Sequence, residues 1–443
     1  MYFHLSRRIV KIKMTVNNSK NIVWQTKKLG EIIKLEYGKP LSKSQRKSNG
    51  LYPVYGANGE KDRTDEYYHD KYSIIVGRKG SAGEINLTEK KFWPLDVSYF
   101  VTLDDKNYNL NFLYYLLGNL ELPKLAKGVK PGINRNEVYS IDVQIPPLPE
   151  QQRIVAILDE AFAAIDTAKE NAEKNLQNAR ELFQSVLSQA VIGKLTKEWR
   201  EEQGEEKTKS DTDLKEIHLR IKGREKKTSR SEETTGHGTI TKALPKEWQF
   251  TSIESLFNLI DYRGKNPPRT KNGRRLITAK NIKMGYLSDE PITFVSEETY
   301  RKWMVRGFPK PDDIFFVTEG HTMGFVALNT RNDDFALAQR TITLQPIVSF
   351  STKYFFYFMM SFYFQSLVKL NATGAAAVGM KASKFRSLPL PFPSFAEQQR
   401  IVAKLDALSA ETQKLEAIYQ QKLADLDELK KSVLQKAFNG GLA

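Results

Sequence analysis

Two long segments of the chain carry apolar residues at steps of three and four, with charged and amide side chains between them. One runs from Glu150 to Gly193 and the other from Glu397 to Gly440, and neither contains an internal proline. Such steps place residues on one face of an α-helix, and a near-heptad stripe is typical of a coiled coil. Prolines before each segment and a glycine at its end predict the helix boundaries. The stripe comprises Leu158, Phe162, Ile165, Leu176, Phe183 and Val186, then Leu405, Leu408, Leu415, Tyr419, Leu426, Leu429 and Val433.

The two helical segments are copies of one another. Residues 150–159 read EQQRIVAILD and residues 397–406 read EQQRIVAKLD, so nine of ten positions agree. The same spacing of 247 residues continues to the glycines at their ends, which identifies an internal repeat. Each helix would be about 65 Å long, and because their lengths and ends match, we expect the two helices to pair with each other. The alternative is that each helix packs only on its own domain.

The stretches that precede the two helices share a plan but little sequence. The first opens with Trp24 and the second with Trp248, and a run predicted to be helical follows each tryptophan, at 28–35 and 252–260. The elements predicted next are strands over 52–58 and 275–281, hairpins over 72–87 and 313–328, and aromatic-rich helices over 112–117 and 354–360.

Glycine-flanked turns join the two strands of each predicted hairpin. A spacing of 241 residues matches Val76 with Val317 and Gly83 with Gly324, and it carries Thr102-Leu103 onto Thr343-Leu344. The two stretches are therefore interpreted as duplicated domains that have diverged. This is the pattern expected of one scaffold that recognises two different targets.

The composition is that of a globular protein with room for two or three hydrophobic cores. The 443 residues are 40% hydrophobic and 11% aromatic, which argues against disorder. The absence of cysteine excludes disulfides, thiolate metal sites and cysteine nucleophiles, and indicates an intracellular protein. The longest apolar run, Tyr354 to Phe364, is too short to span a bilayer. The basic N-terminus has no signal-peptide core, and Met14 is an alternative to Met1 as the native start.

The net charge of +16 is unevenly distributed along the chain. The long helices are neutral or slightly acidic, whereas the N-terminal tail and the two globular stretches are basic. Two basic modules and a neutral spacer suit a polyanion such as DNA; the alternative is a solvated basic surface without a partner. The segment charges are +5 for 1–20, +4 for 21–149, −2 for 150–195, +1 for 196–244, +8 for 245–396 and 0 for 397–443.

Catalytic signatures are incomplete in this sequence. The run Asn266 to Arg269 resembles the Asn-Pro-Pro-aromatic motif of amino-methyltransferases, but the arginine cannot stack on a flipped base as an aromatic residue does. Asp312 and Glu319 resemble part of a metal nuclease site, but His321 stands where a lysine is expected. The sequence has no phosphate loop of the GxxxxGK[ST] type, and its five histidines lack the spacing of metal ligands. We therefore predict that the chain is not an enzyme and holds no metal.

The positive signal is a set of basic and polar side chains on turns beside strands and aromatic residues. Lysine and arginine can bind phosphates or guanine, and hydroxyl and amide side chains can contact other base edges. For any single residue, a solvated surface position remains the alternative. The candidate DNA-binding residues are Lys43, Arg46, Arg78, Lys79, Ser81, Lys130 and Asn134 in the first stretch, and Arg263, Arg269, Arg274, Arg275, Lys280, Thr318, His321, Thr322 and Lys381 in the second.

These features resemble the specificity subunit of type I restriction–modification systems. Two divergent blocks each open with tryptophan and close on a proline-rich turn followed by EQQRIVA, in the stretches IPPLPEQQRIV and LPLPFPSFAEQQRIV. The resemblance covers residues 22–443 and is most specific in the long helices. The N-terminal extension departs from it.

The resemblance implies an α+β protein in which two α/β target recognition domains each bind one half of a split DNA site. The two helices would form an antiparallel coiled coil with pseudo-two-fold symmetry, which spaces the half-sites and binds two modification (methyltransferase) subunits. Restriction (translocase/nuclease) subunits would join them in the prokaryotic cytoplasm. S-adenosylmethionine, ATP and Mg would be bound by these partners, and no cofactor by this chain.

On this basis we divide the chain into six parts. They are a basic extension (1–21), the first block (22–149), the first long helix (150–195), a charged connector with a helix predicted over 211–227 (196–244), the second block (245–396) and the second long helix (397–443). Two alternative functions remain at this stage. One is a non-enzymatic coiled-coil scaffold joining two protein partners, and the other is a stand-alone methyltransferase or nuclease.

Overall fold

The computed structural model describes residues 23–203, 215, 244–264, 266–347, 350–374 and 378–439. The predicted basic extension and the predicted connector helix lie outside the described residues, apart from Lys215. The described chain forms two compact units. Unit 1 contains the first block, α4 up to Glu173 and α14 from Gln420; unit 2 contains residues 174–419.

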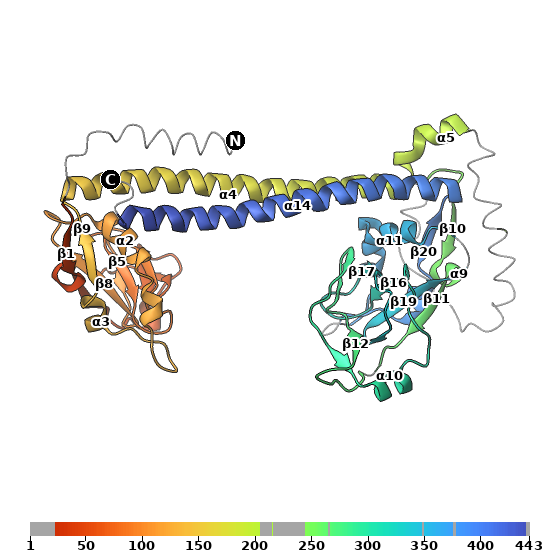
Figure 1. Ribbon diagram of the computed structural model, residues 1–443, viewed down its shortest axis with the longest axis horizontal. Helices are drawn as coiled ribbons and strands as arrows, with labels where there is room; N and C mark the ends of the chain where they lie inside the picture. The colour runs from red at the N-terminus through yellow and green to blue at the C-terminus, as the bar shows by residue number, and fades with distance from the viewer. Residues whose placement is uncertain are drawn as a thin grey trace. The chain divides into compact units, whose positions relative to one another are not determined.

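Unit 1 contains three sheets, whose strand orders are β2-β8-β5-β6, β4-β3-β7 and β1-β9 (Figure 1). Pairing is antiparallel except between β3 and β7. The strands are β1 Gln25–Lys28, β2 Ile33–Tyr37, β3 Tyr52–Gly56, β4 Gly59–Thr64, β5 Ile74–Gly77, β6 Ile85–Leu87, β7 Trp93–Pro94, β8 Ser98–Leu103 and β9 Asp142–Ile145. The helices of the block are α2 Leu110–Asn119 and α3 Arg135–Tyr139, with 3-10 turns at Leu29–Glu31, Lys43–Gln45 and Leu122–Leu125.

Unit 2 repeats this plan with the sheets β11-β19-β16-β17, β15-β12-β18 and β10-β20, and adds the hairpin β13-β14. Its strands are β10 Gln249–Ser252, β11 Phe257–Asp261, β12 Arg274–Ile277, β13 Ile282–Lys283, β14 Tyr286–Leu287, β15 Phe294–Val295, β16 Ile314–Val317, β17 Val326–Leu328, β18 Phe335–Leu337, β19 Thr341–Pro346 and β20 Pro389–Phe392. Its block helices are α9 Ile253–Leu256, α10 Glu297–Trp303, α11 Thr352–Met360, α12 Phe362–Leu370 and α13 Ala382–Arg386. The strands, hairpins and aromatic helices predicted from the sequence are therefore present.

The prediction that each block opens with a helical run is wrong. Residues 28–35 form a 3-10 turn followed by β2, and residues 252–260 form the four-residue α9 followed by β11. In β2 the exposed Lys34 lies between buried Ile33 and Leu35. That alternation is typical of a strand with one buried face, and pairing with β8 decides the outcome.

The hairpin turns also correct the match between the two blocks. The Gly83 N–H donates to the Gly77 carbonyl at 2.7 Å, and the Gly324 N–H donates to the Val317 carbonyl at 2.9 Å. Gly77 therefore corresponds to Val317, and the predicted match of Val76 with Val317 is wrong by one residue because the second turn is one residue longer.

The strand that follows each hairpin, β8 or β19, shows a larger error in the predicted residue match between the two blocks. Gly77 pairs with Ser98 and Val317 pairs with Thr341, so Leu103 of β8 corresponds to Pro346 of β19. The predicted match of Thr102-Leu103 with Thr343-Leu344 is wrong by two residues. Only the strand register distinguishes the predicted match from the observed one, because a shift of two residues along a strand still aligns apolar positions with each other.

The two long helices are α4, Leu148–Val191, and α14, Phe395–Phe438, and each has 44 residues. In unit 1, Lys430 of α14 forms an ion pair with Asp166 of α4 at 2.9 Å, and Asp427 pairs with Lys169. Residue numbers rise along one helix as they fall along the other, so the helices run antiparallel. In unit 2, Arg180 of α4 pairs with Glu416 of α14 at 3.2 Å.

Some residues of the apolar stripes pack between the two long helices, and others pack into the core of a block. Ile165 and Ala168 of α4 pack against Leu426 of α14, as a coiled coil requires. Leu158 belongs instead to the core of the first block, and Leu405 to the core of the second. Phe183 is buried in the core of the second block. The rest of the predicted stripe divides similarly: Phe162, Val186, Leu408, Leu429 and Val433 border these clusters, Leu176 and Tyr419 are half-buried, and Leu415 is 40% exposed.

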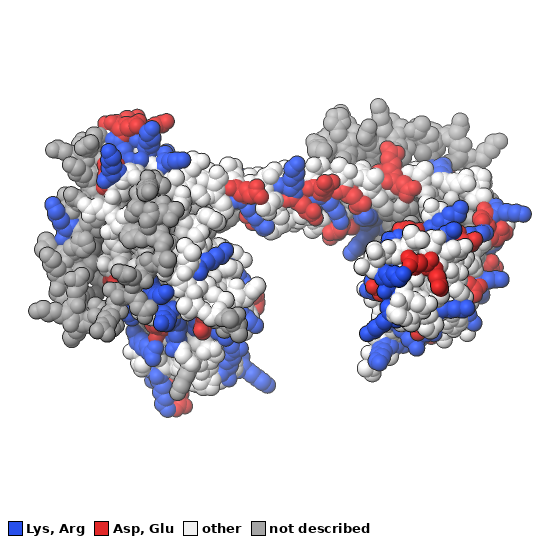
Figure 2. Space-filling view, turned by 180° about the vertical axis from the view of Figure 1, so that it is seen from behind, with Lys and Arg blue, Asp and Glu red and all other residues white. Residues whose placement is uncertain are grey.

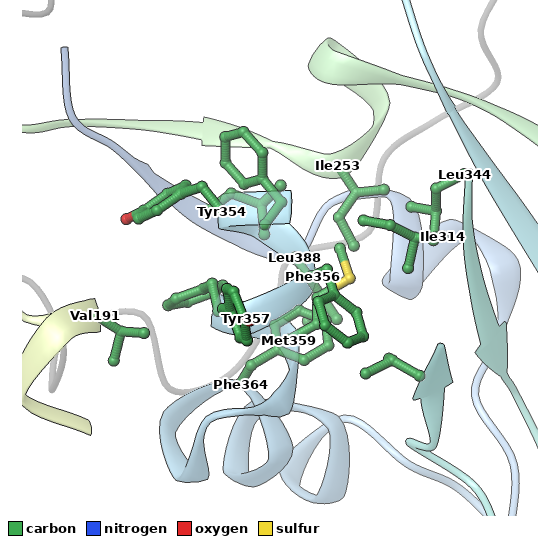
Figure 3. Packing of buried hydrophobic residues seen from close by; sticks show 14 of the residues in the cluster. Val191, Ile253, Ile314, Leu344, Tyr354, Phe356, Tyr357, Met359, Phe364 and Leu388 are labelled. Carbon is green, nitrogen blue, oxygen red and sulfur yellow. The ribbon is translucent and has the colours of Figure 1, made fainter. Parts of the chain in front are cut away.

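The core of unit 2 joins α4, α14 and the second block into one cluster. Val191 of α4 and Ile401 of α14 share it with Ile253 and with the aromatic face of α11. Figure 3 shows Tyr354, Phe356 and Tyr357 of α11 within this cluster. The second half of α4 is thus held by the same hydrophobic contacts that fold the block.

A duplicated buried glutamine attaches each long helix to an aromatic helix of the block. Gln151, 1% exposed, donates to the Pro146 carbonyl at 2.9 Å and accepts from the Asn109 N–H at 2.8 Å. Gln398, fully buried, donates to the Pro393 carbonyl at 3.0 Å and accepts from the Ser351 N–H at 3.2 Å. Asn109 and Ser351 are the N-cap residues of α2 and α11. The repeated glutamine therefore fixes where the aromatic helix of each block begins.

A second repeated contact lies two helical turns further on. Asp159 accepts from the Tyr115 hydroxyl of α2, and Asp406 accepts from the Tyr357 hydroxyl of α11 at 2.6 Å. Burial, followed by these bonds to carboxylates, raises the pKa of both tyrosines well above its ordinary value. The repeated EQQRIVA-LD sequence thus contains the glutamine and the aspartate that attach each long helix to its block.

Replacing either buried glutamine with alanine should destabilise its unit. Gln151→Ala and Gln398→Ala leave buried carbonyl and N–H groups without partners, at a cost of about 1–3 kcal/mol in the free energy of unfolding. Chemical denaturation of the purified chain measures this loss. The exposed neighbours provide matched controls, since Gln152→Ala and Gln399→Ala should change the free energy by less than about 0.5 kcal/mol. Equal losses at both positions of a pair would contradict the proposed attachment.

Candidate nucleic-acid interface

Three segments far apart in sequence meet at the glycine turn of unit 1. The Arg78 N–H donates to the Val97 carbonyl at 2.9 Å, and the Arg78 carbonyl accepts from the Ile133 N–H at 3.1 Å. The Gly80 N–H donates to the Pro131 carbonyl at 2.9 Å. The turn after β5 is therefore held between Val97, the residue before β8, and the small-residue loop that leads into α3.

Glycine is required in this turn for steric reasons. A Cβ on Gly77 would lie 2.0 Å from the Ser81 carbonyl oxygen, and Gly83 has φ +84°. Residues other than glycine rarely adopt that backbone φ. Glycine therefore allows the close turn, and the hydrogen bonds to Val97 and Ile133 hold the backbone of Arg78 in it.

Two arginines share one tyrosine at this place. The guanidinium carbons of Arg78 and Arg135 lie 5.3 and 5.0 Å from the ring centre of Tyr37, which is 46% exposed at the end of β2. Tyr37 packs edge-on against Tyr99 of β8 with 5.1 Å between ring centres. Burial raises the pKa of Tyr99, and the neighbouring Tyr37 raises it further. We call Tyr37, Arg78, Tyr99 and Arg135 the Tyr37 cluster.

The Tyr37 cluster lacks an internal counter-charge. Within the described part of the chain, neither Arg78 nor Arg135 forms an ion pair, and the Nε of Arg78 is buried without a hydrogen-bond partner. The exposed Lys79 and Lys130 lie on the two segments that frame the cluster. Such a surface attracts an anion.

Unit 2 builds the same backbone frame. The Thr318 N–H donates to the Arg340 carbonyl, the Met380 N–H donates to the Thr318 carbonyl, and the Gly320 N–H donates to the Val378 carbonyl, each at 2.9 Å. These bonds match Thr318 to Arg78 and Met380 to Ile133. The frame therefore exists twice, with different side chains on it.

The arginines of the second frame are neutralised by carboxylates. Asp261, which ends β11 as Tyr37 ends β2, binds Arg263 at 2.7 Å, and Glu319 pairs with Arg340 at 3.5 Å. Burial by itself raises the pKa of Asp261, but hydrogen bonds from Arg263 outweigh it and hold the pKa below its ordinary value. Arg263 also donates to the Met380 carbonyl at 3.1 Å.

Four matched positions thus differ in chemistry between the units. Strand register and the framing bonds match Tyr37 with Asp261, Arg78 with Thr318, Lys79 with Glu319 and Arg135 with Ala382. Arg135 and Ala382 are the first residues of α3 and α13. Tyr37, Tyr99, Arg135 and Asp261 were not predicted from the sequence, because their proximity depends on sheet pairing.

The remaining candidate DNA-binding residues lie in several different environments. Arg46 donates to the Leu41 carbonyl, Asn134 caps α3, Thr318 is buried with its hydroxyl on the Arg340 carbonyl, and Lys381 is the N-cap residue of α13. Arg274 pairs with Glu297 at 2.9 Å and Arg275 contacts Asp289. The other residues are exposed or half-buried on turns: Lys43, Ser81, Arg269, Lys280, His321 and Thr322.

Charge is distributed differently on blocks and helices. Figure 2 shows lysine and arginine over the visible face of each block, and both signs alternating along the helix pair. Among the residues the structure describes, no group of three His, Asp or Glu side chains could hold a metal ion, and no helix is long and apolar enough to cross a membrane.

Comparison with known proteins finds a family match over both blocks. The family described as "Type I restriction modification DNA specificity domain" matches residues 21–177 and 245–423, which together are more than half of the chain. The Type I restriction enzyme EcoDI specificity subunit of Escherichia coli is 23% identical over 430 residues, covering 95% of this chain and 88% of its own length. The EcoKI specificity subunit of Escherichia coli strain K12 is 22% identical over 389 residues, covering 83% and 74%.

Solved structures include a chain of the same fold. One described as "Structural basis underlying complex assembly and conformational transition of the type I R-M system" matches with a TM-score of 0.65 and 15% identity. The match covers 95% of this chain and 99% of that chain.

Removing the Asp261 charge should destabilise unit 2 in a pH-dependent way. Since the pKa of Asp261 is lowered from 3.8, its carboxylate stabilises the fold above about pH 4, and the effect is lost as pH falls through the lowered value. Asp261→Asn should therefore reduce the free energy of unfolding by roughly 1–3 kcal/mol at pH 7, and the reduction should be smaller near pH 3.

Denaturation of wild type and variant at both pH values measures this difference. Asp105→Asn, which removes an exposed carboxylate 3.7 Å from Lys71, is the control and should have an effect below about 0.5 kcal/mol. A loss that is the same at both pH values would contradict the electrostatic role of Asp261.

Proposed function

Because the chain belongs to the type I restriction–modification DNA specificity family, we propose that each of its two blocks recognises one half of a divided DNA site. The chain is the DNA sequence-recognition subunit of a restriction–modification complex, and it performs no catalysis. One observation supports the division of the site: a duplicated backbone frame carries unlike side chains at matched positions.

The distribution of charge supports DNA as the ligand of the blocks. The blocks carry +4 and +8, whereas the long helices carry −2 and 0. Contacts from lysine and arginine to phosphates supply affinity that does not depend on base sequence. The exposed Lys43, Lys130, Arg269 and Lys280 suit that role.

The paired helices suit a spacer and a docking surface for other subunits. Each helix is anchored at its beginning by a buried glutamine and contributes to the core of a block. In this proposal, the antiparallel pair sets the distance between the two DNA half-sites. In this proposal, two modification subunits bind along the helices and transfer methyl groups to adenine N6, using S-adenosylmethionine.

Restriction subunits, with ATP and Mg, complete the assembly that cleaves unmodified DNA. A cytoplasmic location follows, since the substrate is DNA that enters the cell. A scaffold that only joins two proteins is the alternative function. It offers no reason for the basic excess on both blocks, and steeply salt-dependent DNA binding would argue against it.

Adenine methylation should reveal a split motif. Cells that express this chain together with its modification subunit are expected to methylate a site with two short specified halves around a fixed gap. Sequencing that detects modified adenine measures the motif. A stable complex that adds no methylation would contradict recognition, and DNA binding measured at several salt concentrations would then test the scaffold alternative.

Shortening the helix pair should change the gap. Deleting one heptad from each helix, residues 172–178 and 418–424, keeps the facing sides in phase and removes about 10 Å. Methylation of the original site should be lost, and sites with a gap shorter by about three base pairs should replace it. An unchanged gap with an intact complex would contradict the spacer role.

A further inference from the structure

We propose that the Tyr37 cluster recognises a guanine in the half-site bound by unit 1, with Arg78 and Arg135 as the specificity-determining residues. This inference rests on the proposed function, and it names the base class that one block selects.

The geometry favours recognition of a base by fixed arginine side chains. The backbone of Arg78 is held by hydrogen bonds to Val97 and Ile133. Arg135 begins α3, whose last residue, Tyr139, accepts a hydrogen bond from the Leu35 N–H of β2 at 2.7 Å. Both guanidinium groups lie over Tyr37. Their planar donor edges are therefore pre-organised, which favours bidentate binding.

The chemistry of these donors selects guanine. In the major groove, guanine presents the acceptors N7 and O6, and bidentate arginine is the commonest specific contact with them. The Nε of Arg78 is buried without a partner among the described residues, so a base would be bound by the terminal amino groups of that guanidinium. No carboxylate pairs with either arginine in the described chain, so both remain available to a ligand.

Comparison with unit 2 argues against a role limited to holding phosphate. Both halves of a DNA site carry the same backbone, so phosphate contacts would be needed alike in both blocks. The matched positions instead carry Asp261, Thr318, Glu319 and Ala382. Positions that change from cationic to acidic or neutral within a retained frame serve to distinguish bases.

The test uses the full chain in complex with its modification subunits. Arg78→Lys and Arg135→Lys retain the charge but remove the planar fork, and Tyr37→Leu removes the supporting ring. Methylation motifs are determined for wild type and each variant, together with DNA affinity at several salt concentrations. Arg301→Lys, on the exposed surface of α10 in unit 2, is the charge-matched control.

Each variant of the Tyr37 cluster should weaken the preference for guanine at one position of one half-site. The preference for G·C at that position should fall about tenfold or more. The base preference of the other half-site should be unchanged, and so should the salt dependence of DNA binding by the lysine variants. All variants should still form the complex, and the control variant should keep the wild-type methylation motif.

Three results would overturn the proposal while leaving the proposed function intact. They are a wild-type split motif that the lysine variants retain, relaxation at an A·T position, and a change in both half-sites. If wild type itself produces no split motif, the proposed function fails and this inference fails with it.

Discussion

A buried amide side chain at the beginning of each long helix determines how that helix meets its block. Gln151 and Gln398 hydrogen-bond to the proline-rich turn on one side and to the N-cap residue of the aromatic helix on the other. A buried amide with lost partners is costly, so the joint tolerates little variation. The hydrophobic cores continue from the blocks into the helices through Leu158 and Leu405. Each block is therefore attached rigidly to its own helix, as a recognition module needs for a defined position on DNA.

Beyond this joint, each block separates its framework from the surface proposed to contact DNA. The framing hydrogen bonds shared by Arg78 and Thr318 join backbone atoms, so the frame can form with different side chains at these positions. Those side chains can change without loss of the fold, and they differ at every matched position described above. The same separation explains how a duplicated domain can acquire a second sequence preference.

Electrostatics distinguishes the two surfaces further. In unit 2, Asp261 and Glu319 neutralise Arg263 and Arg340 within the protein, which orients those arginines and reduces the attraction of phosphate. In unit 1, the arginines pack on an aromatic ring and retain their full charge. Cation–π contacts orient a guanidinium without neutralising it. The two blocks therefore present different donors and acceptors from one scaffold.

The sequence alone determined the internal repeat, the two long helices, the basic blocks and the family, because helical periodicity and an exact repeat are local properties of the chain. It also identified Arg78 and the glycine turn, since glycines beside basic residues are visible without a structure. It did not determine the strand at the start of each block, the shifted match between the hairpins, or the grouping of Tyr37, Tyr99 and Arg135. These depend on which strands pair and in what register, and the pairing joins residues that are 21 to 70 positions apart. Only the tertiary structure decides such contacts, because a one-residue change of register leaves the local pattern intact but moves every side chain to the opposite face.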